Sequence, residues 1–71
     1  MKLLTWNCNL NLVEKFEILE PHNCDIFIIQ ECERLKTNFF PNYDYFWSGK
    51  NEKKGLGILV TKSLKARICL L

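Results

Sequence analysis

The sequence has few of the residues from which metal and redox sites are usually built. Its cysteines stand far apart, at positions 8, 24, 32 and 69, and no two of them form a C-x-x-C pair. This spacing gives little support for a zinc site, and we expect reduced thiols that behave as small apolar side chains. Histidine occurs once, at His22, in a polar connection where nothing marks it as a catalytic base.

Long apolar runs are absent as well. The run of residues 26–29 is far shorter than the roughly 20 residues that a membrane-spanning helix needs. The N-terminus turns polar at Thr5, which is unlike a signal peptide. Gly55 and Gly57 flank Leu56 without completing a G-x-G-x-x-G loop for a nucleotide. These absences predict a cytoplasmic protein with no membrane partner.

The chain does contain enough apolar surface for one small domain, residues 1–71. It has 71 residues and a mass of 8.4 kDa, with 48% hydrophobic and 25% charged residues. A chain of this length buries about 60% of the surface that it exposes when unfolded, so its core is small. The aromatic share of 13% is high and argues against a disordered chain.

Charge is distributed unevenly along the chain. Residues 1–33 carry a net charge of −4, and residues 34–71 carry a net charge of +6. An acidic half beside a basic half suits a site that holds a metal ion and faces a phosphate. Charge alone favours the simpler interpretation, which is two solvated faces.

The first part of the chain predicts a β-α-β unit. A strand ends near Asn7, a loop extends through Asn11, and the apolar positions that follow recur at the spacing of one helical face. Asn11 is expected to cap that helix with Glu14 as its capping-box partner, and Pro21 ends it. Residues 25–31 contain an apolar run, residues 26–29, that is typical of a strand covered on both faces. The crossover predicts that the two strands are parallel neighbours.

The rest of the chain predicts further strands. We assign residues 32–42 to a loop, 43–48 to a third strand, 49–54 to a charged turn, 56–61 to a fourth strand and 65–71 to a fifth. The predicted fold class is therefore α/β (α+β). A sheet of about five strands with one short helix cannot cover both of its faces. We expect an incomplete part of a larger fold or an obligate oligomer, in which a second chain or a missing C-terminal portion covers the sheet.

Two polar residues stand where the strands of the β-α-β unit end. They are Asn7 and Glu31. If the strands are parallel neighbours, these residues share the edge at which open α/β sheets place their ligands. A carboxylate and a carboxamide oxygen are hard ligands suited to Mg²⁺, which keeps several waters. A turn asparagine and a solvated glutamate remain the simpler interpretation of these two residues alone.

The chain carries three short motifs, at residues 6–9, 25–31 and 54–59, that resemble the endonuclease/exonuclease/phosphatase superfamily, which includes the AP endonucleases and related bacterial exonucleases. The first strand of that family ends in W/F-N-x-N/D, and its second strand reads D-hydrophobic-Q-E. Its later paired strands carry a Lys/Gly-rich stretch that runs into G-hydrophobic-hydrophobic. The three matching segments occur in the family's order and together span nearly the whole chain.

The resemblance implies the N-terminal β-α-β-β-β portion of a two-sheet α/β sandwich, incomplete at the C-terminus. It also implies a fragment of a phosphoester hydrolase, of nuclease or phosphatase type, that uses Mg²⁺ or Mn²⁺. Glu31 would be the metal-binding carboxylate, with Asn7 beside it at the metal or the phosphate and Asn9 close to the metal. In such enzymes the ion polarises the phosphoryl oxygen while a base-activated water attacks in line.

Two parts of the family's site have no counterpart in this sequence. Neither the internal Asp-x-Asn motif nor the C-terminal Ser-Asp-His motif occurs. His22 lies where the family has no catalytic residue. We therefore expect the isolated chain to be inactive, and whether it is an enzyme is left open.

A cluster of basic residues lies in the predicted charged turn, beside an aromatic residue. The cluster consists of Lys50, Lys53 and Lys54, and the aromatic residue is Trp47. Positive side chains next to an aromatic ring can hold a single-stranded nucleic acid by charge and stacking. A solvated hairpin tip is the simpler interpretation. Two alternatives to a hydrolase fragment thus stay open: a small basic nucleic-acid-binding domain, and a non-enzymatic, truncated module that depends on a partner.

Overall fold

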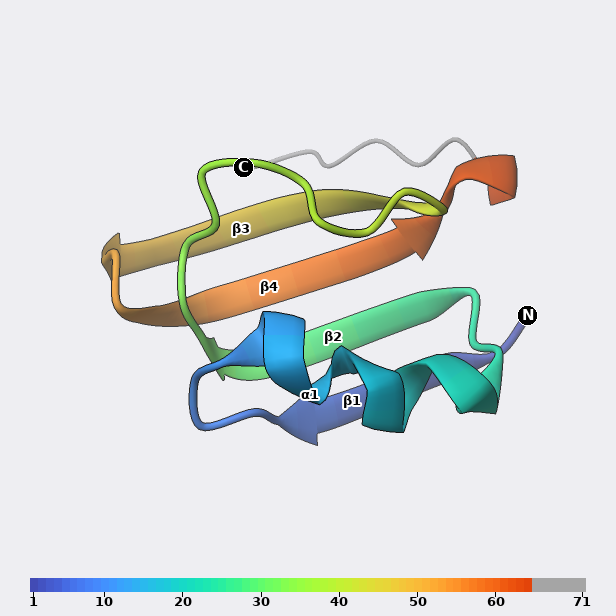
Figure 1. Cartoon of the computed structure of the whole chain (residues 1–71), viewed down its shortest axis with the longest axis horizontal. Coiled ribbons are helices and arrows are strands. Elements are labelled where there is room, and N and C mark those ends of the chain that lie inside the picture. The colour runs from blue at the N-terminus through green and yellow to red at the C-terminus, as the bar shows by residue number, and fades with distance from the viewer. Residues whose placement is uncertain (65–71) are drawn as a thin grey trace.

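The computed structural model of the chain describes residues 1–64, which form one mixed sheet with a helix on one face (Figure 1). The elements in chain order are β1 (Leu3–Asn7), α1 (Leu12–Leu19), the 3₁₀ turn η1 (Glu20–His22), β2 (Ile26–Cys32), β3 (Tyr43–Asn51), β4 (Lys54–Thr61) and the 3₁₀ turn η2 (Lys62–Leu64). The predicted β-α-β-β-β order is confirmed. The predicted fifth strand, residues 65–71, lies outside the described residues. No helix in this part of the chain has the length and apolar character needed to cross a bilayer.

The four strands lie in the order β1-β2-β4-β3. β1 and β2 are parallel, with Leu3 opposite Ile26 and Asn7 opposite Gln30. This pairing confirms the parallel β-α-β unit predicted from the sequence. β4 runs antiparallel to both β2 and β3. The two strands of the β-α-β unit therefore end at the same edge of the sheet, beside the start of β4.

An extra residue in β2 interrupts the pairing of β2 with β4 near that edge. Ile29 lies opposite Gly57 and Cys32 lies opposite Gly55, so three steps along β2 match two steps along β4. Such a bulge bends the strand and redirects the side chains within it. Glu31 lies in the bulge with a φ of 52°, a left-handed conformation that is uncommon outside glycine.

The N-terminus of α1 is capped in a different way from the one that the sequence predicts. Asn11 has φ 62° and ψ 46°, and its side chain makes no capping hydrogen bond, so the predicted capping box with Glu14 is wrong. A capping asparagine normally has an extended backbone, which Asn11 lacks. The Leu12 amide instead donates to both carboxylate oxygens of Glu33, each at 3.2 Å. The cap thus comes from the residue that follows β2.

The β3–β4 hairpin is longer than predicted. The segment 49–54 was expected to be a turn, but β3 continues to Asn51 and β4 begins at Lys54, which leaves only two residues in the turn itself. Two glycines explain the difference. Because Gly49 and Gly55 have no side chains, the Trp47 ring can lie across the paired strands at these positions. A Cβ atom would lie 2.8 Å from that ring at Gly49 and 2.5 Å from it at Gly55.

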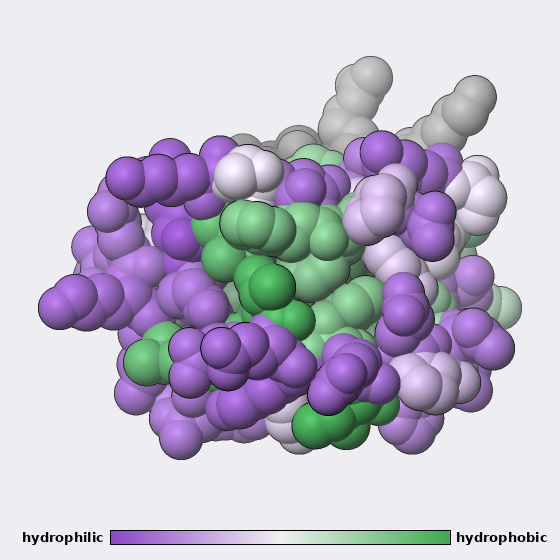
Figure 2. Space-filling model, viewed as in Figure 1, coloured by the Kyte–Doolittle hydropathy of each residue, from purple (hydrophilic) through white to green (hydrophobic). Residues whose placement is uncertain are grey.

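The core lies between α1 and the sheet. The Phe16 ring of α1 contacts Phe27 of β2 at 5.6 Å and Tyr43 of β3 at 5.4 Å between centroids, both edge to face. Further buried side chains come from β2, β4, α1 and the loops; they include Cys8, Leu12, Leu19, Cys24, Ile29, Cys32, Phe40 and Leu59. The side seen in Figure 2 shows apolar side chains gathered beside α1 with polar ones around them.

The opposite face of the sheet is also largely apolar. Strand alternation places Ile26, Ile28, Phe46 and Ile58 on the side away from α1. All four side chains are partly buried. α1 is the only α-helix among residues 1–64, and it covers the other side. That a second chain or further residues cover this face stays a prediction.

Candidate functional site

The structure brings Asn7 and Glu31 into direct contact. The Asn7 side-chain amide donates a hydrogen bond of 2.6 Å, from Nδ2 to Oε2 of Glu31. The parallel register brings the end of β1 level with the bulge of β2, and the bulge brings the Glu31 carboxylate within reach of Asn7. The sequence therefore located this pair from strand ends alone.

The loop after β1 fixes the backbone on which this pair stands. The Cys8 amide donates to the carbonyl of Gln30 at 2.9 Å, and the Leu10 amide donates to the carbonyl of Glu31 at 2.8 Å. These bonds continue the pairing of β1 with β2 past the end of the strand. The Glu31 carbonyl in the bulge therefore has a hydrogen-bond partner.

A third residue, Lys54, completes the cluster. Its Nζ atom lies 2.8 Å from Oε1 of Glu31, so each carboxylate oxygen of Glu31 faces one donor. Lys54 begins β4, and the next residue, Gly55, lies opposite Cys32 of β2. Residue types and spacing do not reveal this contact, because only the pairing of β2 with β4 brings the two residues together.

The surroundings of Glu31 favour its charged form. Hydrogen bonds from Lys54 and then from Asn7, together with the positive charge of Lys54, lower the pKa of Glu31 below its usual value. The carboxylate is therefore ionised at neutral pH. The Glu31 side chain is 36% exposed and that of Lys54 is 52% exposed, so solutes can reach both groups.

A divalent metal ion at this edge would have few protein ligands. Within residues 1–64 no three His, Cys, Asp or Glu side chains come together as a metal cluster. The available protein ligands are therefore the Glu31 carboxylate and the Asn7 carbonyl oxygen, both hard oxygen donors. Mg²⁺ commonly binds one or two carboxylates and keeps several waters. The Asn7 amide group points to Glu31 in this arrangement, so its main effect is to orient the carboxylate.

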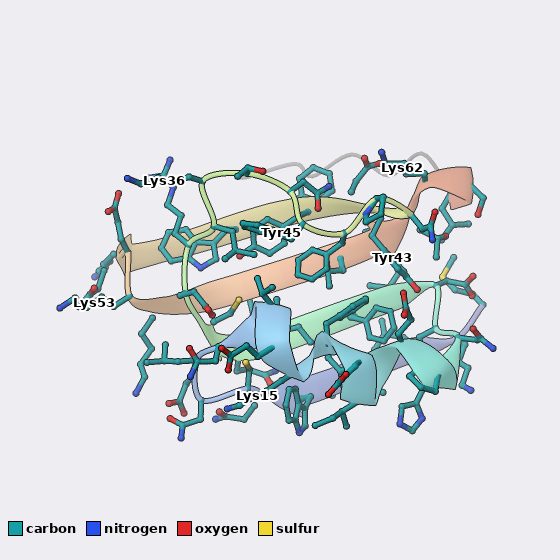
Figure 3. All side chains as sticks on the ribbon, viewed as in Figure 1. Lys15, Lys36, Tyr43, Tyr45, Lys53 and Lys62 are labelled. Carbon is teal, nitrogen blue, oxygen red and sulfur yellow. The ribbon has the colours of Figure 1, made fainter. Side chains whose placement is uncertain are left out.

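Asn9 lies in the loop beyond β1, where three successive residues, 9–11, have positive φ values. Its carbonyl oxygen accepts a hydrogen bond of 3.3 Å from Lys15 Nζ, which also donates to the Cys8 carbonyl at 2.8 Å. Figure 3 shows Lys15 on α1 beside this loop. No hydrogen bond among the described residues joins the Asn9 side chain to Asn7 or Glu31. The metal-proximal role of Asn9 stays a prediction.

A hydrogen bond and packing against two glycines hold the Trp47 side chain in place. Its indole N–H donates to the Cys32 carbonyl at 2.9 Å, and its ring lies against Gly49 and Gly55. The side chain is partly buried against the core. Lys50 and Lys53 are exposed at the hairpin tip next to it. A stacking role for Trp47 would therefore use only the part of the ring that the hairpin leaves open.

Two further cations lie at the hairpin end, and the sequence did not single them out. A cleft of about 320 Å³ is lined by Arg34, Leu35, Lys36 and Glu52. The Arg34 amide donates to the Glu52 carbonyl at 2.8 Å, and its guanidinium lies 3.1 Å from the Glu52 carboxylate. Figure 3 shows Lys36 and Lys53 at the same end of the molecule. The loop after β2 thus extends the basic surface of the hairpin.

Comparison with models of protein families, with curated proteins and with solved structures finds no match to this chain. The resemblance of three motifs to the endonuclease/exonuclease/phosphatase superfamily stays an interpretation of the sequence. The contacts among Asn7, Glu31 and Lys54 are the structural evidence that bears on function.

Proposed function

We propose that the edge formed by Asn7, Glu31 and Lys54 is the metal- and phosphate-binding part of a divalent-metal-dependent phosphoester hydrolase. The observation that supports this most is the 2.6 Å hydrogen bond between Asn7 and Glu31 at the ends of two parallel strands. An exposed, ionised carboxylate held by a carboxamide at this place in an α/β sheet suits a metal ion. The motif resemblance adds the reaction class.

Each residue has a distinct task in this proposal. Glu31 holds Mg²⁺ or Mn²⁺ through its carboxylate, and Asn7 keeps that carboxylate in one orientation. The ion, when bound, polarises the phosphoryl oxygen and stabilises the leaving oxygen. Lys54 adds a positive charge next to the position of the phosphate.

The described residues supply no general base to this edge. His22 ends η1 before β2 begins, whereas Glu31 lies in the bulge near the other end of β2. A strand length therefore separates the imidazole from the carboxylate. We expect the isolated chain to bind a metal ion but not to hydrolyse phosphoesters, because its one histidine lies far from this edge.

Metal binding is tested by titrating the ¹⁵N-labelled chain with MgCl₂ and following the amide signals in NMR spectra. We expect the side-chain amide of Asn7 and the backbone amide of Glu31 to shift, and Glu31→Gln to abolish both shifts. Glu52→Gln is the matched control, because it removes an exposed carboxylate at the hairpin turn. Identical responses of the wild type and Glu31→Gln would refute the proposal.

Activity is tested with bis(p-nitrophenyl) phosphate, a general phosphodiester, in the presence of Mg²⁺ or Mn²⁺. We expect no hydrolysis above the buffer rate. Metal-dependent hydrolysis that Glu31→Gln abolishes would show that the chain carries its own base, contrary to the argument above.

The basic hairpin end supports a second candidate function, the binding of single-stranded nucleic acid. Lys50 and Lys53 at the hairpin tip and Arg34 and Lys36 at the cleft provide cations on one end of the molecule. Such binding weakens steeply as the salt concentration rises. It would also survive Glu31→Gln, whereas Mg²⁺ binding would not. Oligonucleotide titrations at two salt concentrations separate the two functions.

A further inference from the structure

Lys54 lies where a metal ion bound to Glu31 would have to compete with it. Its ammonium group is 2.8 Å from Oε1, and Asn7 already donates to Oε2. Mg²⁺ binds oxygen at about 2.0–2.1 Å, so an ion on Oε1 would stand within a few ångströms of the ammonium. The single negative charge of Glu31 cannot neutralise both a divalent ion and an ammonium group, so the two cations compete for it.

We infer that Lys54 is an internal counter-ion of Glu31 that the metal displaces and that then binds the phosphate group of the substrate. This inference rests on the function proposed above. It assigns to one side chain two successive partners, the carboxylate in the free protein and the phosphate in the loaded site.

The backbone geometry allows this exchange without any movement of the sheet. Lys54 is the first residue of β4 and is paired with Asn51 across the hairpin turn. Its neighbour Gly55 is paired with Cys32, the residue that follows Glu31. The main chain is therefore fixed on both sides of the site. The side chain is 52% exposed and has a flexible four-carbon stem, so its ammonium group can turn away from the carboxylate while its Cα atom stays in place.

A phosphate is the partner that the displaced ammonium group would then find. A metal-bound phosphate ester keeps negatively charged oxygens, and lysine binds such oxygens as a compact point charge with three donors. Placed between the ion and the ammonium, the phosphate also removes the repulsion between them. Metal and phosphate are therefore expected to strengthen each other's binding by the same factor, as linkage requires.

The experiment measures Mg²⁺ binding by NMR titration of the full chain, with and without inorganic phosphate, at low ionic strength. Lys54→Met removes the charge and keeps the apolar stem. Lys53→Met is the matched control, because it makes the same change at the exposed neighbouring position. We expect Lys54→Met to bind Mg²⁺ alone more tightly than Lys53→Met by up to about fivefold, the range for exposed ion pairs. Phosphate should tighten Mg²⁺ binding in Lys53→Met but not in Lys54→Met.

The outcomes separate this inference from the proposed function. Equal Mg²⁺ affinities of the two variants, at a site that Glu31→Gln abolishes, would overturn the displacement while leaving the metal site intact. An unchanged effect of phosphate in Lys54→Met would overturn the role of Lys54 as the phosphate ligand. Failure of the wild type and of Lys54→Met to bind Mg²⁺ would overturn the proposed function and the inference together.

A measurement on the wild type tests the displacement even if a variant fails to fold. The ε-methylene and ammonium signals of Lys54 report whether its ion pair with Glu31 is intact. Addition of MgCl₂ is expected to shift these signals, while those of Lys53 stay in place. Lys54 signals that do not respond while the Asn7 amide does would refute displacement.

Discussion

Gly55 offers the sharpest test of how the hairpin is packed against the candidate site. In Gly55→Ala the new Cβ atom would lie 2.5 Å from Cζ2 of Trp47 and 2.7 Å from the carbonyl oxygen of Ser48. The Ser48 carbonyl belongs to the backbone of β3, where that residue is paired with Leu56. It cannot move without opening the hairpin. The Trp47 ring cannot move without losing its hydrogen bond to the Cys32 carbonyl.

The expected loss of stability follows from these contacts. Overpacking a fitted position costs about 1–3 kcal/mol. Weakening the indole hydrogen bond costs about another 1 kcal/mol. Replacing glycine by alanine stabilises by about 0.4–1 kcal/mol through the unfolded chain. We therefore expect a net loss of about 1–3.5 kcal/mol, which for a domain of this size lowers Tm by roughly 4–28 °C.

Thermal unfolding followed by tryptophan fluorescence and circular dichroism measures this loss. Gly57→Ala is the control, because its Cβ atom would meet only side chains, with Cys32 Sγ at 3.0 Å and Tyr45 Cε1 at 3.3 Å. We expect it to lose less than Gly55→Ala. A Gly55→Ala protein with the Tm of the wild type would refute the packing of Trp47 across the hairpin.

Two further predictions concern the cap of α1 and the buried thiol beside it. Glu33→Gln should lower the free energy of unfolding by about 1 kcal/mol, because it weakens the cap of α1. Glu17→Gln, on the exposed side of α1, should leave the free energy of unfolding unchanged. Urea unfolding of both variants measures the difference. Burial raises the pKa of Cys32 to about 11 and raises that of Tyr45 as well, so the folded chain keeps protons that the unfolded chain releases above pH 9. Stability should therefore fall as the pH rises from 9 towards 11, and a free energy of unfolding that stays constant across this range would contradict the burial of both groups.

The sequence predicted the part of the fold that depends on local patterns. The apolar run of β2 and the helical spacing of α1 identified the β-α-β unit, and the crossover rule made its strands parallel. From this unit alone it followed that Asn7 and Glu31 share an edge. The hydrogen bond between them needed only the additional bend of the bulge.

The parts that the sequence did not predict depend on pairings between distant segments. Glu33 caps α1 only because β2 ends beside the start of that helix, and Asn11 loses its capping role to a left-handed backbone. The contact of Lys54 with Glu31 depends on the antiparallel pairing of β2 with β4. Local propensity carries no information on either contact, so neither could be found from residue types and spacing.

The predicted length of the hairpin turn is wrong for a related reason. Gly49 is a typical turn residue, and with several lysines nearby it favours a long charged turn over residues 49–54, which leaves Gly55 outside the turn. The structure uses both glycines inside the strands to make room for Trp47. Whether a glycine serves a turn or a close approach depends on which ring packs against it, and that is a tertiary property.

The strand order of the sheet also bears on how the chain reaches its folded state. The turn that joins β3 to β4 has two residues, so this hairpin closes at little entropic cost. β2 must instead find β4 across the whole of β3, with Ile26 opposite Val60. Long-range pairings of this kind form slowly, because the loop must close before its contacts contribute. We therefore expect the hairpin to form first and Glu31 to meet Lys54 only when β2 docks, which pulse-labelled hydrogen exchange during refolding would detect as late protection of β2.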